Sequence, residues 1–257
     1  MNHAMNARLT GLGVVALALA SGTAQAEVSS TITVASDYDF RGVTQTALDP
    51  ALQASLDWAG ESGLYAGLWG SNVDFGDGDE GSGPNVEVDL LLGYSGSFME
   101  DFGYDVGGTY YSYRGEDDNV SSVDYYEIKG GLSYTELAST AFWYSPDYGN
   151  SDKSAWYVEL NGDVPLPWWE LGTTLHAGYS GGDYWSSTDD EYYDWAVGLT
   201  RSFGHFDFAV KYVDGSDLKN YDCSRQSIEC GGDPVFSSES KVVFSIATTF
   251  PWAKDEG

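Results

Sequence analysis

Hydrophobic and polar residues alternate with a period of two along most of the chain. The pattern is clearest in the segment 241–250, where Val242, Phe244, Ile246, Thr248 and Phe250 alternate with Lys241, Val243, Ser245, Ala247 and Thr249. A β-strand with one apolar face and one more polar face produces this period. About ten alternating residues form a tilted strand that crosses a bilayer. A half-buried strand of a soluble β-sandwich would alternate in the same way, so this segment alone leaves both folds open.

The same alternation, together with the turn-forming residues between segments, predicts about twelve strands. They are expected at 28–38, 51–59, 64–73, 86–94, 104–113, 126–134, 138–145, 155–161, 171–179, 192–199, 206–212 and 241–250. Glycines interrupt the third of these segments, so which of its side chains face inward is ambiguous. An even number of strands fits an all-β fold with a single antiparallel transmembrane β-barrel, which we expect to span residues 27–257.

Three features favour the barrel over the sandwich. The apolar faces carry essentially no charge, with Arg201 at a strand end as the exception, as lipid contact requires. All prolines, at positions 50, 84, 146, 165, 167, 234 and 251, are expected in connections or just beyond a strand, since every strand amide in lipid needs a partner. The connections 39–50, 74–85, 114–122, 146–154, 181–191 and 214–238 are mostly longer and more acidic than the others. They are expected to face outside the cell.

Aromatic residues at the predicted strand ends suggest two interfacial girdles. One is expected to contain Tyr38, Tyr144, Trp156, Tyr179, Tyr193 and Tyr212, and the other Trp58, Tyr94, Tyr104, Tyr134, Trp168 and Phe206. Amphipathic rings suit the boundary between membrane and water.

The first 26 residues have the pattern of a secretory signal peptide. Arg8 precedes an apolar stretch from Leu12 to Ala20, and Ala24-Gln25-Ala26 is a small-x-small site, so we expect cleavage after Ala26. No later apolar run reaches the ~18 residues of a transmembrane helix. The sequence therefore predicts an exported protein of the cell outer membrane, in contact with its lipid.

Formal charge is −29, from 40 acidic and 11 basic residues, which disfavours a nucleic-acid partner. Many charges lie on the predicted inward faces. The expected pore-lining residues are Asp57, Glu87, Asp89, Asp105, Glu127, Lys129, Glu159, Asp194, Asp207 and Lys211, with Lys241 as a further counter-charge. They predict a wall that favours small cations and other small solutes. An internal salt-bridge network that plugs the barrel is the alternative, because twelve strands lie between the ~8 that side chains fill and the ~16 that leave an aqueous channel.

The first long loop contains Phe40-Arg41-Gly42. Arg41 could fold inward and meet the acidic wall. Alternatively, Gly42 supplies a turn with positive φ and Arg41 is solvated.

Three segments in this region carry a resemblance to a known family. They are Ser36-Asp-Tyr-Asp-Phe-Arg-Gly-Val-Thr-Gln-Thr46, Asp49-Pro-Ala-Leu-Gln53 and Ser62-Gly-Leu-Tyr-Ala-Gly-Leu-Trp-Gly-Ser-Asn-Val-Asp-Phe75. In this order they resemble the TorF-type porin family of proteobacterial outer-membrane β-barrels. The resemblance is densest over residues 28–96 and implies a porin-like channel. The tail 251–257 departs from a chain that ends in Phe.

An outer-membrane acyl hydrolase is a rival class, which would need a Ser and a His within hydrogen-bond reach. Only His176 and His205 remain after processing, and His176 has hydroxyls nearby at Thr174 and Ser180. A lone histidine on a polar strand face is usually structural, so we expect no enzyme activity, catalytic residue or cofactor. The acidic run 77–81 lacks the later carboxylate of an EF-hand, and we expect no metal site. A purely structural or adhesive barrel is a third possibility. The sequence does not indicate an oligomeric state.

Cys223 and Cys230 share one polar segment of an exported chain, which predicts a disulfide. Mass spectrometry of non-reduced peptides should show the two cysteines joined, closing a short ring that stabilises the loop by a few kcal/mol at most. Two freely alkylatable thiols in oxidised, native protein would contradict the prediction.

Overall fold

The computed structural model describes residues 26–78, 81–166, 170–188, 190–216, 218 and 234–252. The predicted signal peptide up to residue 25, the girdle residue Trp168 and the predicted Cys223–Cys230 disulfide lie outside these residues.

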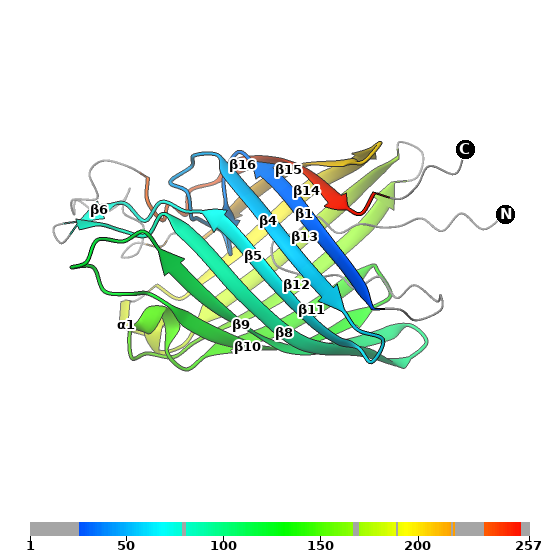
Figure 1. The fold of residues 1–257 in the computed structure, drawn as a ribbon, viewed down its shortest axis with the longest axis horizontal. Coiled ribbons are helices and arrows are strands. Elements are labelled where there is room, and N and C mark those ends of the chain that lie inside the picture. The colour runs from blue at the N-terminus through cyan, green and yellow to red at the C-terminus, as the bar shows by residue number, and fades with distance from the viewer. Residues whose placement is uncertain are drawn as a thin grey trace.

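Twelve strands of the described chain form one closed antiparallel barrel (Figure 1), as the alternation predicts. They are β1 (Glu27–Ala35), β4 (Ala51–Ala59), β5 (Leu64–Asn72), β8 (Val86–Met99), β9 (Phe102–Arg114), β10 (Tyr125–Tyr134), β11 (Ala138–Ser145), β12 (Ala155–Leu166), β13 (Leu171–Gly181), β14 (Tyr192–Phe203), β15 (Phe206–Gly215) and β16 (Lys241–Phe250). Each barrel strand pairs with the next along the chain. The first and last then pair with each other, for example Thr33 with Ala247, so the barrel has no free edge.

Side chains alternate between the two faces of the wall. On β8, Leu90 and Leu92 are exposed on the outside, whereas Glu87 and Asp89 are buried inside. The ambiguous strand β5 follows the same rule, since Leu68 faces outward and Tyr65 inward. The exterior is therefore an apolar surface suited to lipid, and the ionisable groups of these strands are held in the lumen.

The two ends of the barrel differ. One end, called here the long-loop end, carries the connections 36–50, 73–85, 115–124, 146–154, 182–191 and 216–240. These contain the small hairpins β2–β3 (Asp39–Phe40, Val43–Thr44) and β6–β7 (Asp77–Gly78, Gly81–Ser82), the 3-10 turn η1 (Tyr148–Asn150) and the helix α1 (Asp183–Thr188). Figure 1 shows β6 and α1 at this same end. The short-turn end has the connections 60–63, 100–101, 135–137, 167–170 and 204–205.

Among the described residues, no helix is both long enough and apolar enough to span a membrane.

Some strand ends differ from the sequence prediction. The predicted turn between Gly96 and Gly103 is wrong, because β8 and β9 continue past both glycines and turn at residues 100–101. A Cβ at position 96 would lie 2.7 Å from the Tyr104 hydroxyl, so this glycine makes room for a neighbouring ring. Pro165 also lies inside β12, one residue before its end, rather than in a connection.

The girdle placement of Tyr38 is wrong as well. β1 ends at Ala35, three residues earlier than predicted, so the alternation no longer governs the direction of Tyr38. Its side chain is buried, and its ring meets that of the inward-facing Trp69 edge-on, with centroids 5.3 Å apart. Tyr38 belongs to the interior rather than to the rim.

The outward face predicts how an added charge is tolerated. Leu92 is 63% exposed near the middle of β8, so Leu92→Arg should destabilise the barrel in vesicles by ~2 to 4 kcal/mol. The control is Phe203→Arg, at the exposed end of β14, where the cost should fall to ~0 to 1 kcal/mol. Urea titration of the vesicle-folded variants measures both. Equal losses at the two positions would contradict a membrane that surrounds the strand centres.

Candidate functional site

The inner wall of the barrel holds the ten predicted pore-lining residues. Each lies beside an exposed hydrophobic residue on its strand and therefore faces inward. Glu87, Asp89, Glu127, Asp194 and Asp207 are buried, and Asp57, Asp105, Lys129, Glu159 and Lys211 are partly buried. The structure thus collects all ten in one lumen.

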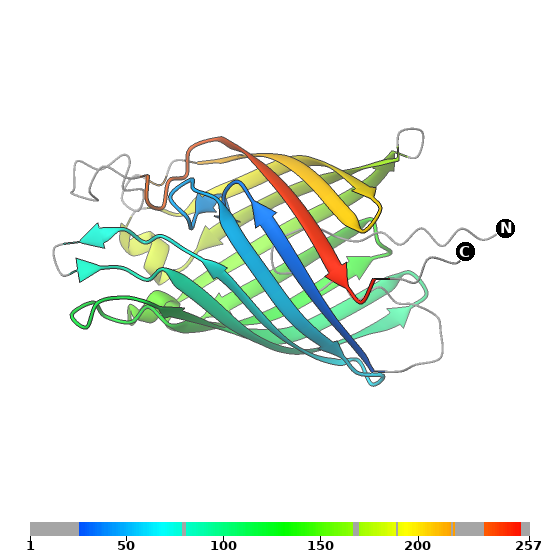
Figure 2. The same ribbon diagram turned by 45° about the horizontal axis from the view of Figure 1, so that its top comes forward.

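Residues 36–50, called here loop L1, lie at the long-loop end of the barrel (Figure 2). L1 joins the adjacent strands β1 and β4, yet the side chain of Arg41 pairs with Glu127 on β10. In the strand order of the barrel, β10 lies on the opposite wall. Arg41 and Gly42 have φ values of 53° and 82°, and a Cβ on Gly42 would lie 2.8 Å from the Asp194 Cβ. The inward-folded alternative for Arg41 is therefore the one observed, with Gly42 supplying a positive-φ turn.

Arg41 and Glu127 form a bidentate ion pair. Arg41 Nη1 donates to Glu127 Oε1 at 2.8 Å and Nη2 to Oε2 at 2.7 Å, and the Tyr111 hydroxyl donates to Oε2 at 3.0 Å. The side chains of Arg41 and Glu127 are only 10% and 1% exposed. Burial opposes the charge on Arg41, but the Glu127 carboxylate outweighs it and raises the pKa of Arg41 above its ordinary value. Arg41 is therefore a permanent cation inside the barrel.

Aromatic rings complete the surroundings of the guanidinium. The Arg41 Cζ atom lies 4.3 Å from the centroid of the Tyr157 ring, 4.6 Å from that of Phe40 and 5.6 Å from that of Trp143. Such distances are those of cation–π contacts. Phe40 belongs to L1, whereas Trp143 and Tyr157 lie on the neighbouring strands β11 and β12.

A second ion-pair group fixes the base of L1. The sequence analysis names its Lys241 as a counter-charge but not the two aspartates that pair with it. Lys241 Nζ lies 3.2 Å from Asp37 Oδ2 and 2.9 Å from Asp39 Oδ1. The Thr44 hydroxyl donates to Asp37 Oδ1, and the Thr46 hydroxyl oxygen lies 3.1 Å from the same carboxylate oxygen. Asp37 lies between β1 and the L1 hairpin and Asp39 begins that hairpin, where the alternation of the barrel strands does not show which way a side chain points.

The remaining lumen charges are unevenly balanced. Lys129 Nζ lies 2.6 Å from Asp105 Oδ1, and the Asp105 side chain is 25% exposed. By contrast, Glu87 accepts a hydrogen bond from the Tyr113 hydroxyl at 2.8 Å, but its Oε2 and Asp89 Oδ1 are buried without a hydrogen-bond partner among the described residues. Neither Glu87 nor Asp89 has an ion pair among the described residues, unlike Asp105 and Glu127.

His176 lies in a different polar cluster. Its Nδ1 is 2.6 Å from Asn161 Oδ1, and its Nε2 is 2.8 Å from Asp194 Oδ1 and 2.9 Å from the Tyr157 hydroxyl. Both ring nitrogens thus contact groups other than the hydroxyls of Thr174 and Ser180. This arrangement orients the imidazole within the wall, and none of these three contacts is the Ser–His hydrogen bond that nucleophilic catalysis uses.

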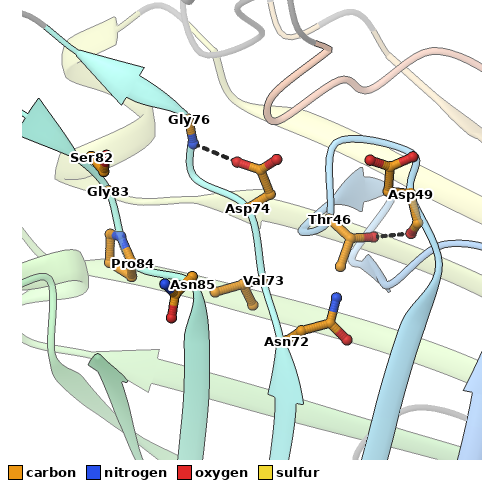
Figure 3. Close-up of a pocket in the computed structure, with 10 residues that line it drawn as sticks. All are labelled: Thr46, Asp49, Asn72, Val73, Asp74, Gly76, Ser82, Gly83, Pro84 and Asn85. Atoms are coloured by element: carbon orange, nitrogen blue, oxygen red, sulfur yellow. Dashed lines mark hydrogen bonds between the residues drawn. The ribbon is translucent and has the colours of Figure 1, made fainter. Parts of the chain in front are cut away.

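A pocket of about 400 Å³ opens beside L1 at the long-loop end (Figure 3). Its lining is mostly polar and comprises Thr46, Asp49, Asn72, Val73, Asp74, Gly76, Ser82, Gly83, Pro84 and Asn85. Thr46 Oγ1 donates to the Asp49 carbonyl at 2.7 Å, and the Gly76 amide donates to Asp74 Oδ1 at 2.8 Å. The pocket therefore lies between L1 and the connection from β5 to β8.

The burial of the Arg41–Glu127 pair predicts a large stability effect. Arg41→Ala leaves Glu127 buried without its cation, which should destabilise the protein by ~3 to 5 kcal/mol. The matched control is Arg114→Ala, because Arg114 pairs with Asp124 at 3.0 Å while its own side chain is 57% exposed. That change should have little effect. Urea unfolding of both variants measures the difference, and equal midpoints would show that the Arg41 pair adds nothing.

Comparison with known proteins supports the fold. No curated protein matches the sequence. The KdgM porin aligns over 88% of this chain and 99% of its own, with 9% identity and a TM-score of 0.51. The NanC porin aligns over 87% and 98%, with 11% identity and a TM-score of 0.48. The outer membrane phospholipase A from Escherichia coli aligns over 87% and 91%, with 10% identity and a TM-score of 0.45. At its low identity, the likeness to the KdgM porin shows a shared barrel fold.

A family match covers most of the chain. Residues 19–250 match the family described as bacterial protein of unknown function (Gcw_chp). The matched region includes every barrel strand of the described residues. The resemblance to the TorF-type family is not tested by this match and stays a prediction. The chain belongs to the Gcw_chp family of bacterial proteins.

Proposed function

We propose that this protein is a porin-like channel of the outer membrane, through which small solutes diffuse passively and cations are favoured. The observation that carries the proposal is the contrast between the two faces of the closed barrel. Outside, exposed apolar side chains such as Leu92 suit lipid, and inside, ten ionisable side chains face the lumen. Burying so many charges without water is costly, so a wall of this kind is expected to face an aqueous space.

Solvent contact within the lumen supports a water-filled passage. Asp105 lies near the short-turn end of β9, and its side chain keeps a quarter of its surface exposed although it is paired with Lys129. Glu127, beneath L1, is almost completely covered. The narrowest part of the proposed passage is therefore at L1, with a wider approach from the short-turn end.

The proposed cation preference follows from the charge balance of the wall. Eight of the ten predicted pore-lining residues are acidic. Carboxylates in a narrow channel with low-dielectric walls raise the local cation concentration. Small cations are thus the proposed preferred solutes.

A plugged barrel with a structural role is the second candidate. The observation that favours it is the near-complete burial of Tyr157 and Glu127 beneath L1, which indicates that the loop closes much of the mouth. The two candidates differ in whether the lumen conducts ions. For an enzyme role we find no support in the His176 contacts, and we propose that the protein is not a hydrolase.

Single-channel recording in planar bilayers tests the channel and its selectivity. Reconstituted protein should conduct, and its reversal potential in a salt gradient should show a cation preference that weakens as salt rises, because the Debye length is only ~8 Å at physiological ionic strength. Neutralising Glu87, Asp89 and Asp105 together should reduce the preference. The control neutralises Asp117, Asp118 and Asp152, which are exposed in the long loops, and should reduce it less.

Two results would overturn parts of this proposal. Correctly inserted protein without conductance would leave the plugged barrel as the function. An anion-selective conductance would show that the basic side chains of the lumen, rather than the carboxylates, control its potential.

A further inference from the structure

The guanidinium of Arg41 occupies a cage built by the barrel wall. Glu127 supplies a carboxylate that accepts both guanidinium N–H groups, and Trp143 and Tyr157 supply ring faces. Glu127, Trp143 and Tyr157 lie on the consecutive strands β10, β11 and β12, and Trp143 pairs directly with Tyr157 across the sheet. Strand positions fix this geometry, so the cage does not depend on L1 for its shape.

The occupant of the cage comes from the loop. Arg41 reaches it from L1 with a left-handed backbone, at φ 53°, which is uncommon for a residue with a side chain and costs free energy. A guanidinium free in solution would meet the same carboxylate and rings without this backbone cost. Arg41 therefore resembles a tethered ligand that competes for the cage.

Charge around the cage selects a cation. Without Arg41, the buried Glu127 carboxylate would lose the basic group with which it is paired in the described residues. The planar donors of a guanidinium match a carboxylate in bidentate fashion and stack on aromatic faces, which a compact ammonium does less well.

We propose that Glu127, Trp143 and Tyr157 form a binding site for a small organic cation with a guanidinium group, and that Arg41 is the built-in competitor for this site. The proposal deepens the proposed cation-favouring channel and rests on it for the route by which the solute arrives. It makes the cage the point where such a solute is recognised and where L1 is displaced.

Methylguanidinium, the head group of Arg41, is the probe. In isothermal titration calorimetry with detergent-folded protein, methylguanidinium should bind Arg41→Ala at least tenfold more tightly than it binds the unmodified protein. Arg41→Ala/Glu127→Gln should lose at least tenfold of that affinity. Methylammonium at the same concentration should bind Arg41→Ala more weakly than methylguanidinium does. Arg114→Ala, which removes an exposed arginine outside the cage, should behave like the unmodified protein.

A second variant covers the case in which Arg41→Ala does not fold. Arg41→Lys keeps a charge opposite Glu127 but removes the two-pronged donor, so methylguanidinium should bind it more tightly than it binds the unmodified protein. Equal affinities for the unmodified protein, Arg41→Lys and Arg41→Ala would overturn the proposal. Equal affinities of Arg41→Ala with and without Glu127→Gln would also overturn it.

Conductance separates this proposal from the channel proposal. In bilayers, millimolar methylguanidinium should reduce the current through Arg41→Ala, whereas the same concentration of added sodium chloride should not. The double variant Arg41→Ala/Glu127→Gln should not be blocked. If the protein binds methylguanidinium in calorimetry but never conducts, the cage proposal stands and the channel proposal is rejected. Conducting Arg41→Ala that neither binds methylguanidinium nor is blocked by it would reject the cage and keep the channel.

Discussion

Every backbone N–H and C=O group of a strand in lipid must be paired within the sheet, because no water is available to replace a missing partner. The pairing of β1 with β16 meets this requirement by closing the barrel. Closure then imposes the other features of the wall. Each strand must show one face to lipid and one to the lumen, and the chain must reverse direction only at the two ends. This constraint is the reason that hydrophobic and polar residues alternate with a period of two along the sequence.

A barrel closed by twelve strands also keeps space at its centre, and L1 occupies part of that space. About eight strands can be filled by the side chains of the wall alone, so a wider barrel keeps space at its centre. L1 enters that space and brings charges with it, and three of them pair with charges on the wall. Arg41 meets Glu127 on β10, and Asp37 and Asp39 meet Lys241 on β16. Charge complementarity, rather than an apolar contact alone, thus sets the position of the loop.

The sequence predicts the strands well because the alternation of hydrophobic and polar residues is a local pattern, which each strand shows independently of the others. Glu127 is placed in the lumen by its neighbours Tyr126 and Ile128, both of which face outward. Its partner could not be predicted in the same way. Which wall L1 reaches depends on barrel closure and on the path of an irregular loop, and neither leaves a periodic signal. The girdle prediction for Tyr38 is wrong for a related reason. β1 ends before this residue, so the alternation of the strand no longer indicates which way its side chain points.

A buried ion pair often adds little net stability compared with an apolar replacement, because desolvation offsets the attraction. Its value lies in specifying one arrangement over others, and the Arg41–Glu127 pair joins a loop to the opposite wall across the lumen. The exterior of the barrel is constrained by lipid, so it can vary little without loss of insertion. Function in such a fold therefore depends on the few contacts that cross the lumen. In this chain those contacts place a cation, a carboxylate and two aromatic rings together inside the long-loop end of the barrel.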